Sequence, residues 1–117
     1  MTTHWQYSID DNICTITFDR QDKEMNVLSE SVMLEFNDVL DKLEKETFEG
    51  VIVHSGKKDF IVGADIEEIA GMETAEEAAE AAGKLQHLFQ RLADLKVPTV
   101  AAIKGQCLGG GLELALA

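Results

Sequence analysis

Three consecutive glycines, Gly109, Gly110 and Gly111, are followed two residues later by Glu113. Because glycine has no side chain, a ligand can reach the main-chain N–H groups of such a run directly. The run lies between a predicted strand and a predicted helix, so its N–H groups also lie at the N-terminus of that helix, the positive end of the helix dipole. This arrangement favours an anion, either a phosphate or the developing oxygen of an enolate. A flexible turn with tight helix–sheet packing is the alternative interpretation.

Glu113 has two interpretations. A carboxylate in the first turn of a helix is stabilised by the dipole without any further role. The other residues of the segment 112–117 are all apolar, however, which predicts a buried helix. A buried carboxylate is costly unless it has partners or a task, so Glu113 is also a candidate general acid or base.

A second segment, Phe60–Ile66, could supply another main-chain donor. Its apolar run stops at Gly63, and Asp65 is most simply the N-cap of a short helix that follows. The N–H of Ala64, at the break, is the second candidate donor. Neither glycine segment has the pattern of a phosphate loop: residues 56–58 lack the hydroxyl residue of GxxxxGK[ST], and residues 105–111 do not read GxGxxG.

These segments together resemble the crotonase (enoyl-CoA hydratase/isomerase) superfamily. The resemblance rests on Phe60–Ile66, on PTVAAIKGQCLGGGLE at residues 98–113, and on Met25-Asn26-Val27-Leu28, which matches a short Asn-x-Leu segment of the family. It is greatest to the N-terminal hydratase part of multifunctional fatty-acid oxidation alpha subunits. It implies a spiral of repeated ββα units, of which residues 1–117 would be the N-terminal part, truncated within the helix after the glycines.

The resemblance also implies roles for individual residues. Ala64 and Gly110 match the two positions whose N–H groups form the family's oxyanion hole, and Glu113 matches the first of its two catalytic glutamates. The second lies beyond the sequence given. The positions implied to contact the acyl-CoA substrate are Val62, Gly63, Ala64, Asp65, Ile66, Gly109 and Gly110. No metal and no cofactor other than the substrate's own coenzyme A is implied.

The implied function is enoyl-CoA hydration in fatty-acid β-oxidation. A Δ3-Δ2 enoyl-CoA isomerase of the same family is an alternative, and so is a non-catalytic acyl-CoA-binding module. Lys57 and Lys58 could meet the phosphates of coenzyme A or lie in a solvated loop, and Ile69 and Met72 could touch the acyl chain. Family members usually form oligomers, so a homo-oligomer or a multifunctional complex is expected.

The amino-acid composition further limits the classes of binding partner. Ten Lys and Arg against 22 Asp and Glu give a net charge of −12, which argues against nucleic acid or an anionic membrane surface as a partner. Two distant cysteines, Cys14 and Cys107, predict reduced thiols. The first residues lack a secretory signal and no apolar run is long enough to span a membrane, so a cytoplasmic location is expected.

Periodicity predicts the α/β elements that must position these residues. A hairpin is expected with strands at 4–9 and 13–18 around a turn at 10–12. A helix should begin at Ser29 or Ser31 and end near Glu46. Its predicted apolar stripe is Val32, Met33, Phe36, Val39, Leu40 and Leu43. A second should run from Ala75 to about Leu95 behind a capping box of Thr74 and Glu77. The remaining expected strands are 51–54 and 99–103, and the apolar run 60–62 should stop at Gly63. The apolar stripe of the second helix is Ala78, Ala82, Leu85, Leu88, Phe89, Leu92 and Leu95.

Overall fold

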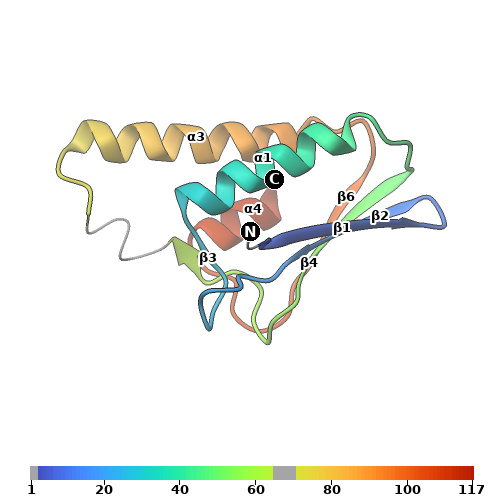
Figure 1. Ribbon diagram of the computed structural model, residues 1–117, viewed down its shortest axis with the longest axis horizontal. Helices are drawn as coiled ribbons and strands as arrows, with labels where there is room; N and C mark the ends of the chain where they lie inside the picture. The colour runs from blue at the N-terminus through green and yellow to red at the C-terminus, as the bar shows by residue number, and fades with distance from the viewer. Residues whose placement is uncertain (1–2, 65–70) are drawn as a thin grey trace.

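The computed structural model describes residues 3–64 and 71–117. Helices and strands alternate, and Figure 1 shows α1 and α3 lying side by side over one face of the main sheet. In chain order the elements are β1 (Trp5–Asp10), β2 (Ile13–Phe18), β3 (Val27–Leu28), α1 (Glu30–Leu43), β4 (Gly50–Ser55), β5 (Gly63–Ala64), α3 (Ala75–Ala93), β6 (Thr99–Ala102) and α4 (Gly110–Leu116). The predicted α/β class is confirmed.

The main sheet has the strand order β1-β2-β4-β6. The first two strands form the predicted antiparallel hairpin, and the remaining pairings are parallel. The hairpin turns at Asp11 and Asn12, which both have positive φ, 50° and 66°. Two such residues match the right-handed twist of the flanking strands, and Asp and Asn tolerate this conformation best after glycine.

A second, small parallel sheet joins β3 to β5, with Val27 opposite Gly63 and Leu28 opposite Ala64. The apolar run 60–62 was expected to stop at Gly63, but strand β5 begins at this residue. Gly63 has φ +133° and still pairs, because a residue without a Cβ atom can bend the chain and remain in the ladder. Beside it, Ile61 forms an isolated parallel bridge with Cys107.

The core lies between the main sheet and the helices. Trp5 stacks on Phe18 with ring centroids 4.2 Å apart and on Phe36 at 4.4 Å. Its indole N–H donates to the carbonyl of Val32, 3.0 Å away. The predicted stripe of α1 is confirmed as Val32, Met33, Phe36, Val39, Leu40 and Leu43, all buried. Of the two candidate caps for this helix, Ser29 accepts the Val32 N–H.

Helix α3 departs from prediction in its first half. Leu88, Phe89 and Leu92 are buried as expected, but Ala78 and Ala82 are exposed. The start of α3 extends past α1, so in the part of the chain that the structure describes no other helix lies beside its first turns (Figure 1). The cap also differs: Thr74 accepts the Glu77 N–H, whereas the Glu77 carboxylate takes the N–H of Glu73 instead of Thr74.

Within residues 3–64 and 71–117, no helix is both long and apolar enough to cross a bilayer.

Candidate active site

Two glycines from distant parts of the chain lie against each other. A Cβ atom placed on Gly109 would be 3.7 Å from the Cα of Gly63, and one on Gly63 would be 3.9 Å from the carbonyl oxygen of Leu108. Both have positive φ, +50° and +133°. The end of β5 and the beginning of α4 are therefore neighbours, which places the backbone of Ala64 and Gly110 in one region.

Backbone hydrogen bonds join the segments that lead into these glycines. The Phe60 N–H donates to Gln106 O at 3.1 Å, and the Leu108 N–H donates to Ile61 O at 3.0 Å. The Asp59 carboxylate accepts the Gln106 N–H at 2.9 Å. These bonds hold segments 59–61 and 106–108 as a paired ribbon, so that the residues immediately after them approach together.

Gly111 allows α4 to begin directly on this ribbon. A Cβ atom at position 111 would lie 2.1 Å from Ile61 O and 2.7 Å from Ile61 Cβ, far inside contact distance. The three glycines thus have separable tasks. Gly109 turns the chain at positive φ, Gly111 permits the close approach, and Gly110, between them, is the first residue of α4.

The other edge of the β5 segment is held by residues 26–28. The Val62 N–H donates to Asn26 O at 3.0 Å, and the β3–β5 pairs follow immediately. Asn26 is 1% exposed, and its carboxamide bonds to four further groups. Sequence reasoning used Asn26 only as part of a family motif; a lone Asn among apolar neighbours was the signal that it could be buried.

The predicted site residues fall in three groups. Val62 is half-buried, Gly63 is buried and Gly109 is exposed, all beside the meeting of β5 and α4. For Ala64, Gly110 and Glu113 the structure describes the backbone: the last residue of β5, the first residue of α4, and the same helix three residues on. Asp65, Ile66 and Ile69, together with the predicted helix cap, lie outside the described residues.

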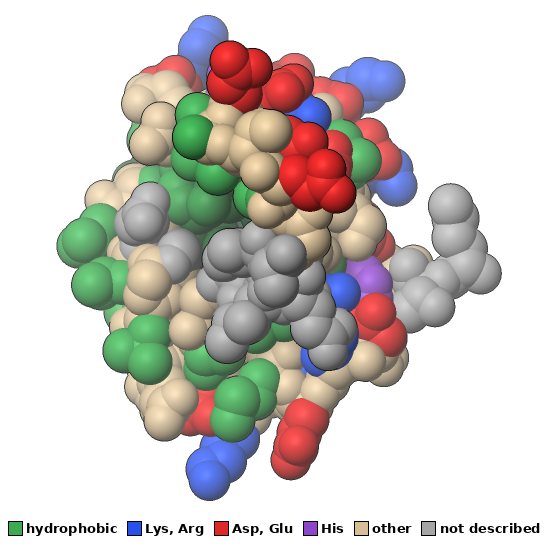
Figure 2. Space-filling model, turned by 90° about the vertical axis from the view of Figure 1, so that its left-hand side faces the viewer, with side chains coloured by type: hydrophobic (Ala, Val, Ile, Leu, Met, Phe, Trp, Pro, Cys, Tyr) green, Lys and Arg blue, Asp and Glu red, His purple; other side chains and the backbone are tan. Residues whose placement is uncertain are grey.

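A groove opens beside this region, and sequence reasoning did not predict it. It has a volume of about 1070 Å³ and lies between α1 and the first half of α3. Figure 2 shows this end of the molecule, with hydrophobic side chains gathered in a hollow below acidic ones. Its apolar lining includes Leu28, Met33, Leu34, Met72, Ala82 and Leu85. Because Leu28 pairs with Ala64, the groove begins next to β5.

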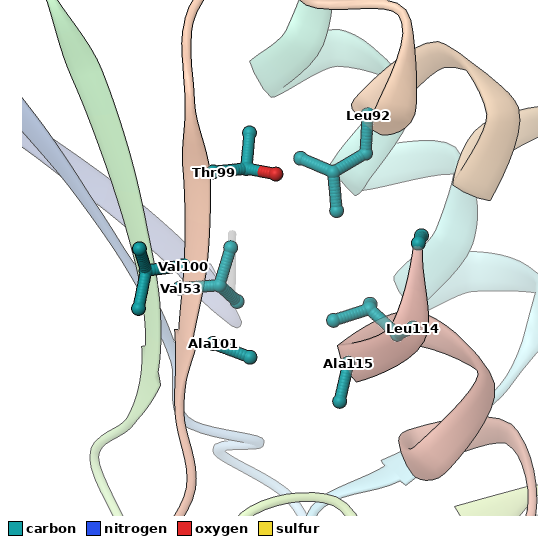
Figure 3. Close-up of a pocket in the computed structure, with 8 residues that line it drawn as sticks. Val53, Leu92, Thr99, Val100, Ala101, Leu114 and Ala115 are labelled. Carbon is teal, nitrogen blue, oxygen red and sulfur yellow. The ribbon is translucent and has the colours of Figure 1, made fainter.

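A second cavity, between β6 and α4, is a packing gap. Its volume is about 20 Å³, room for roughly one water molecule. Figure 3 shows Val53, Leu92 and Leu114 pointing into it from the sheet and the helices. It is too small for a substrate.

One cationic side chain and one thiol lie in the segments that lead to the site, and neighbouring residues explain the state of each. Lys57 pairs with Asp19 at 2.8 Å. Burial raises the pKa of the Cys107 thiol, which disfavours the reactive thiolate. Among the residues that the structure describes, no three His, Cys, Asp or Glu side chains gather as a metal site would require.

A comparison with known protein families identifies the family of this chain. The family model described as enoyl-CoA hydratase/isomerase matches residues 8–117. The chain belongs to this family, the crotonase superfamily.

Relatives and solved structures agree with that assignment. The chain is 49% identical over 111 residues to the fatty acid oxidation complex subunit alpha of Aliivibrio fischeri and 46% identical over 110 residues to that of Idiomarina loihiensis. Each match covers 92% of this chain but only 16% of the relative. The enoyl-CoA hydratase of Bacillus anthracis superposes with a TM-score of 0.87 at 28% identity, over 97% of this chain and 45% of that one. The enoyl-CoA hydratase of Thermoplasma volcanium superposes with a TM-score of 0.89 at 26% identity, over 97% of this chain and 45% of that one.

Proposed function

We propose that this chain carries the carbonyl-binding part of an enzyme that adds water to 2-enoyl-CoA thioesters in fatty-acid β-oxidation. The observation that carries the proposal is the contact between Gly63 and Gly109, each of which immediately precedes a candidate donor, Ala64 or Gly110. Membership of the enoyl-CoA hydratase/isomerase family supports the choice of an acyl-CoA thioester as the ligand.

The chemistry needs two N–H donors at one oxygen. When the oxygen of water bonds to C3 of the enoyl group, the C2=C3 electron pair moves toward the thioester carbonyl, whose oxygen becomes negative. The N–H groups of Ala64 and Gly110 donate to that oxygen. Preorganised donors of this kind stabilise the transition state more than the ground state, because the charge on the oxygen grows during the reaction.

Glu113 is the proposed acid/base residue. Its carboxylate takes a proton from the attacking water, and a proton is returned to C2 as the enolate collapses to the 3-hydroxyacyl product. In the family pattern a second glutamate, outside the 117 residues, shares this work. Placing Glu113 on the same short helix as Gly110 couples the proton-transfer group to the carbonyl-binding group.

The groove suits the hydrocarbon part of the substrate. It is lined largely by apolar side chains and begins beside Leu28, the pairing partner of Ala64, so an acyl chain bound there would have its thioester end near β5. The coenzyme A moiety is proposed to contact Val62, Gly63, Asp65, Ile66 and Gly109. Hydration involves no net oxidation or reduction, and we propose that no cofactor beyond the substrate's own coenzyme A takes part.

The curated relatives are named as subunits of a fatty acid oxidation complex. We therefore propose that the protein acts in a homo-oligomer or in a multifunctional complex, in the cytoplasm.

Loss of the conjugated-enoyl absorbance of crotonyl-CoA tests the proposal. Hydration removes the C2=C3 bond and with it the absorbance. Conversion of a 3-enoyl-CoA without hydration would identify an isomerase instead. Saturable binding of crotonyl-CoA with no absorbance change would identify a binding module, and absence of both binding and turnover would overturn the assignment.

A further inference from the structure

We propose that Asn26 is a positioning residue for the carbonyl-binding site: its buried carboxamide sets the position of the Ala64 N–H relative to the Gly110 N–H. The inference deepens the proposed function and rests on it. Asn26 itself belongs to neither the donor pair nor the acid/base machinery, and it acts through the segments that carry them.

The side chain of Asn26 joins three parts of the fold. Its Oδ1 accepts the Arg20 N–H at 2.8 Å. Its Nδ2 donates to Phe18 O at 3.0 Å, to Ser55 Oγ at 2.9 Å and to Phe60 O at 3.0 Å. Phe18 and Ser55 form the last pair of the β2–β4 ladder. The carboxamide thus attaches the end of the main sheet to the segment that leads into β5.

From Asn26 the connection to Ala64 is short. The main-chain oxygen of Asn26 accepts the Val62 N–H at 3.0 Å, so residue 26 holds the chain on both sides of Ile61. The pairs Val27–Gly63 and Leu28–Ala64 come next along the same two segments. Position and tilt of the Ala64 backbone are therefore set by the segment that Asn26 anchors to the main sheet.

A second connection runs from Asn26 toward Gly110. The Ser55 hydroxyl, which accepts from Asn26, donates to Asp59 O at 2.6 Å. The Asp59 carboxylate in turn accepts the Gln106 N–H at 2.9 Å. Gln106 lies on the ribbon that leads into the glycines. One buried side chain is thus bonded, directly or through two residues, to both segments that supply the donors.

This arrangement explains why the group is an amide. Asn26 offers two N–H protons to three acceptors and one oxygen to a backbone donor, and it is 1% exposed, so water cannot replace a lost bond. An aspartate has the same shape but would present an acceptor to two carbonyl oxygens. Asn26→Asp should therefore separate these groups while leaving the packed volume nearly unchanged.

The test uses the protein expressed at its full length, with Asn26→Asp and Asn26→Ser as variants. Arg91→Ala is the matched control, because Arg91 joins α3 to Asp41 and Glu44 of the α1 region, away from β5. Three quantities are measured: kcat for crotonyl-CoA, KM for the same substrate, and the absorption maximum of a bound, conjugated aryl-enoyl thioester. Polarisation of the carbonyl by N–H donors moves that maximum to longer wavelength, and a purely structural change does not.

We expect both Asn26 variants to fold, to lower kcat by about 10- to 100-fold with KM changed less than about threefold, and to lose most of the red shift, because one misplaced donor weakens carbonyl stabilisation. Arg91→Ala should keep kcat and the red shift despite a lower melting temperature. An unchanged red shift in the Asn26 variants would overturn the inference, and so would failure of both to fold. If the unsubstituted protein shows neither red shift nor turnover, the proposed function fails instead.

Discussion

Gly109 lies directly against Gly63, close enough that a Cβ atom at position 109 would be 3.7 Å from the Cα of residue 63. Neither glycine is itself a proposed donor. Each precedes one, so their contact brings the backbones of Ala64 and Gly110 close together, as the proposed binding of one carbonyl oxygen requires.

Removing a single N–H tests the donor role of Gly110. Gly110→Pro deletes the N–H at the first residue of a helix, the one helical position that proline favours, whereas Gly110→Ala keeps it. We expect the proline variant to lower kcat for crotonyl-CoA by about 10²- to 10³-fold and the alanine variant to have a much smaller effect. Equal activities, measured in variants with matching circular dichroism, would remove the Gly110 N–H from the mechanism.

Gly111 should be intolerant of any side chain. Gly111→Ala places a Cβ atom 2.1 Å from Ile61 O, so α4 must shift away from the ribbon. We expect the melting temperature and kcat both to fall, with a loss of about 1–3 kcal/mol in the free energy of unfolding.

Gly83→Ala is the control for that substitution. Position 83 lies inside α3, and no atom of another described element lies within 4 Å of the added Cβ, so alanine should raise stability by about 0.5–1 kcal/mol. Chemical denaturation of both variants measures the contrast, and a stable, fully active Gly111→Ala would show that the close approach is not required.

Glu113→Gln tests proton transfer. The amide keeps the shape of the carboxylate but cannot accept a proton from water, so kcat should fall by about 10²- to 10⁴-fold while crotonyl-CoA binding is largely kept. Turnover and equilibrium binding are measured on the same preparation. Undiminished turnover would exclude Glu113 as the acid/base residue.

A pH-dependent contribution to stability is expected at Asp22. A hydrogen bond from Arg20, 2.8 Å away, lowers the pKa of this carboxyl below its ordinary value of 3.8. Because the pKa is lower in the folded than in the unfolded state, the contribution is present above pH 3.8 and is lost as the pH falls through the folded-state pKa. Asp22→Asn should therefore be less stable than the unsubstituted protein at pH 7, and urea unfolding should show the difference shrinking below pH 3.8. A difference independent of pH would exclude this carboxyl as its source.

Local features of the fold followed from sequence patterns. The α1 stripe, the Asp11-Asn12 turn and the Thr74 cap were predictable because each depends on residues within one or two turns of chain. The candidate donors and Glu113 were also named from sequence, through glycine spacing and family resemblance. Their roles remain proposals.

Features that depend on distant neighbours were not predictable in this way. Ala78 and Ala82 continue the apolar stripe of α3 but are exposed, because helical periodicity shows which face of a helix is apolar and not how far its neighbour extends. Likewise the Glu77 carboxylate accepts the N–H of Glu73, and Gly63, where the apolar run 60–62 was expected to stop, pairs with Val27.

The amino-acid sequence alone thus determined the types of the helices and strands, their apolar faces and the glycines that leave main-chain N–H groups accessible. These features reflect the conformational preferences of residues close together in the chain. Tertiary structure alone decided that Gly63 meets Gly109, that Asn26 reaches both segments and that a groove opens beside Leu28. The physical reason is that such contacts arise from the registers in which remote segments pair, and a register depends on the packing of the whole core.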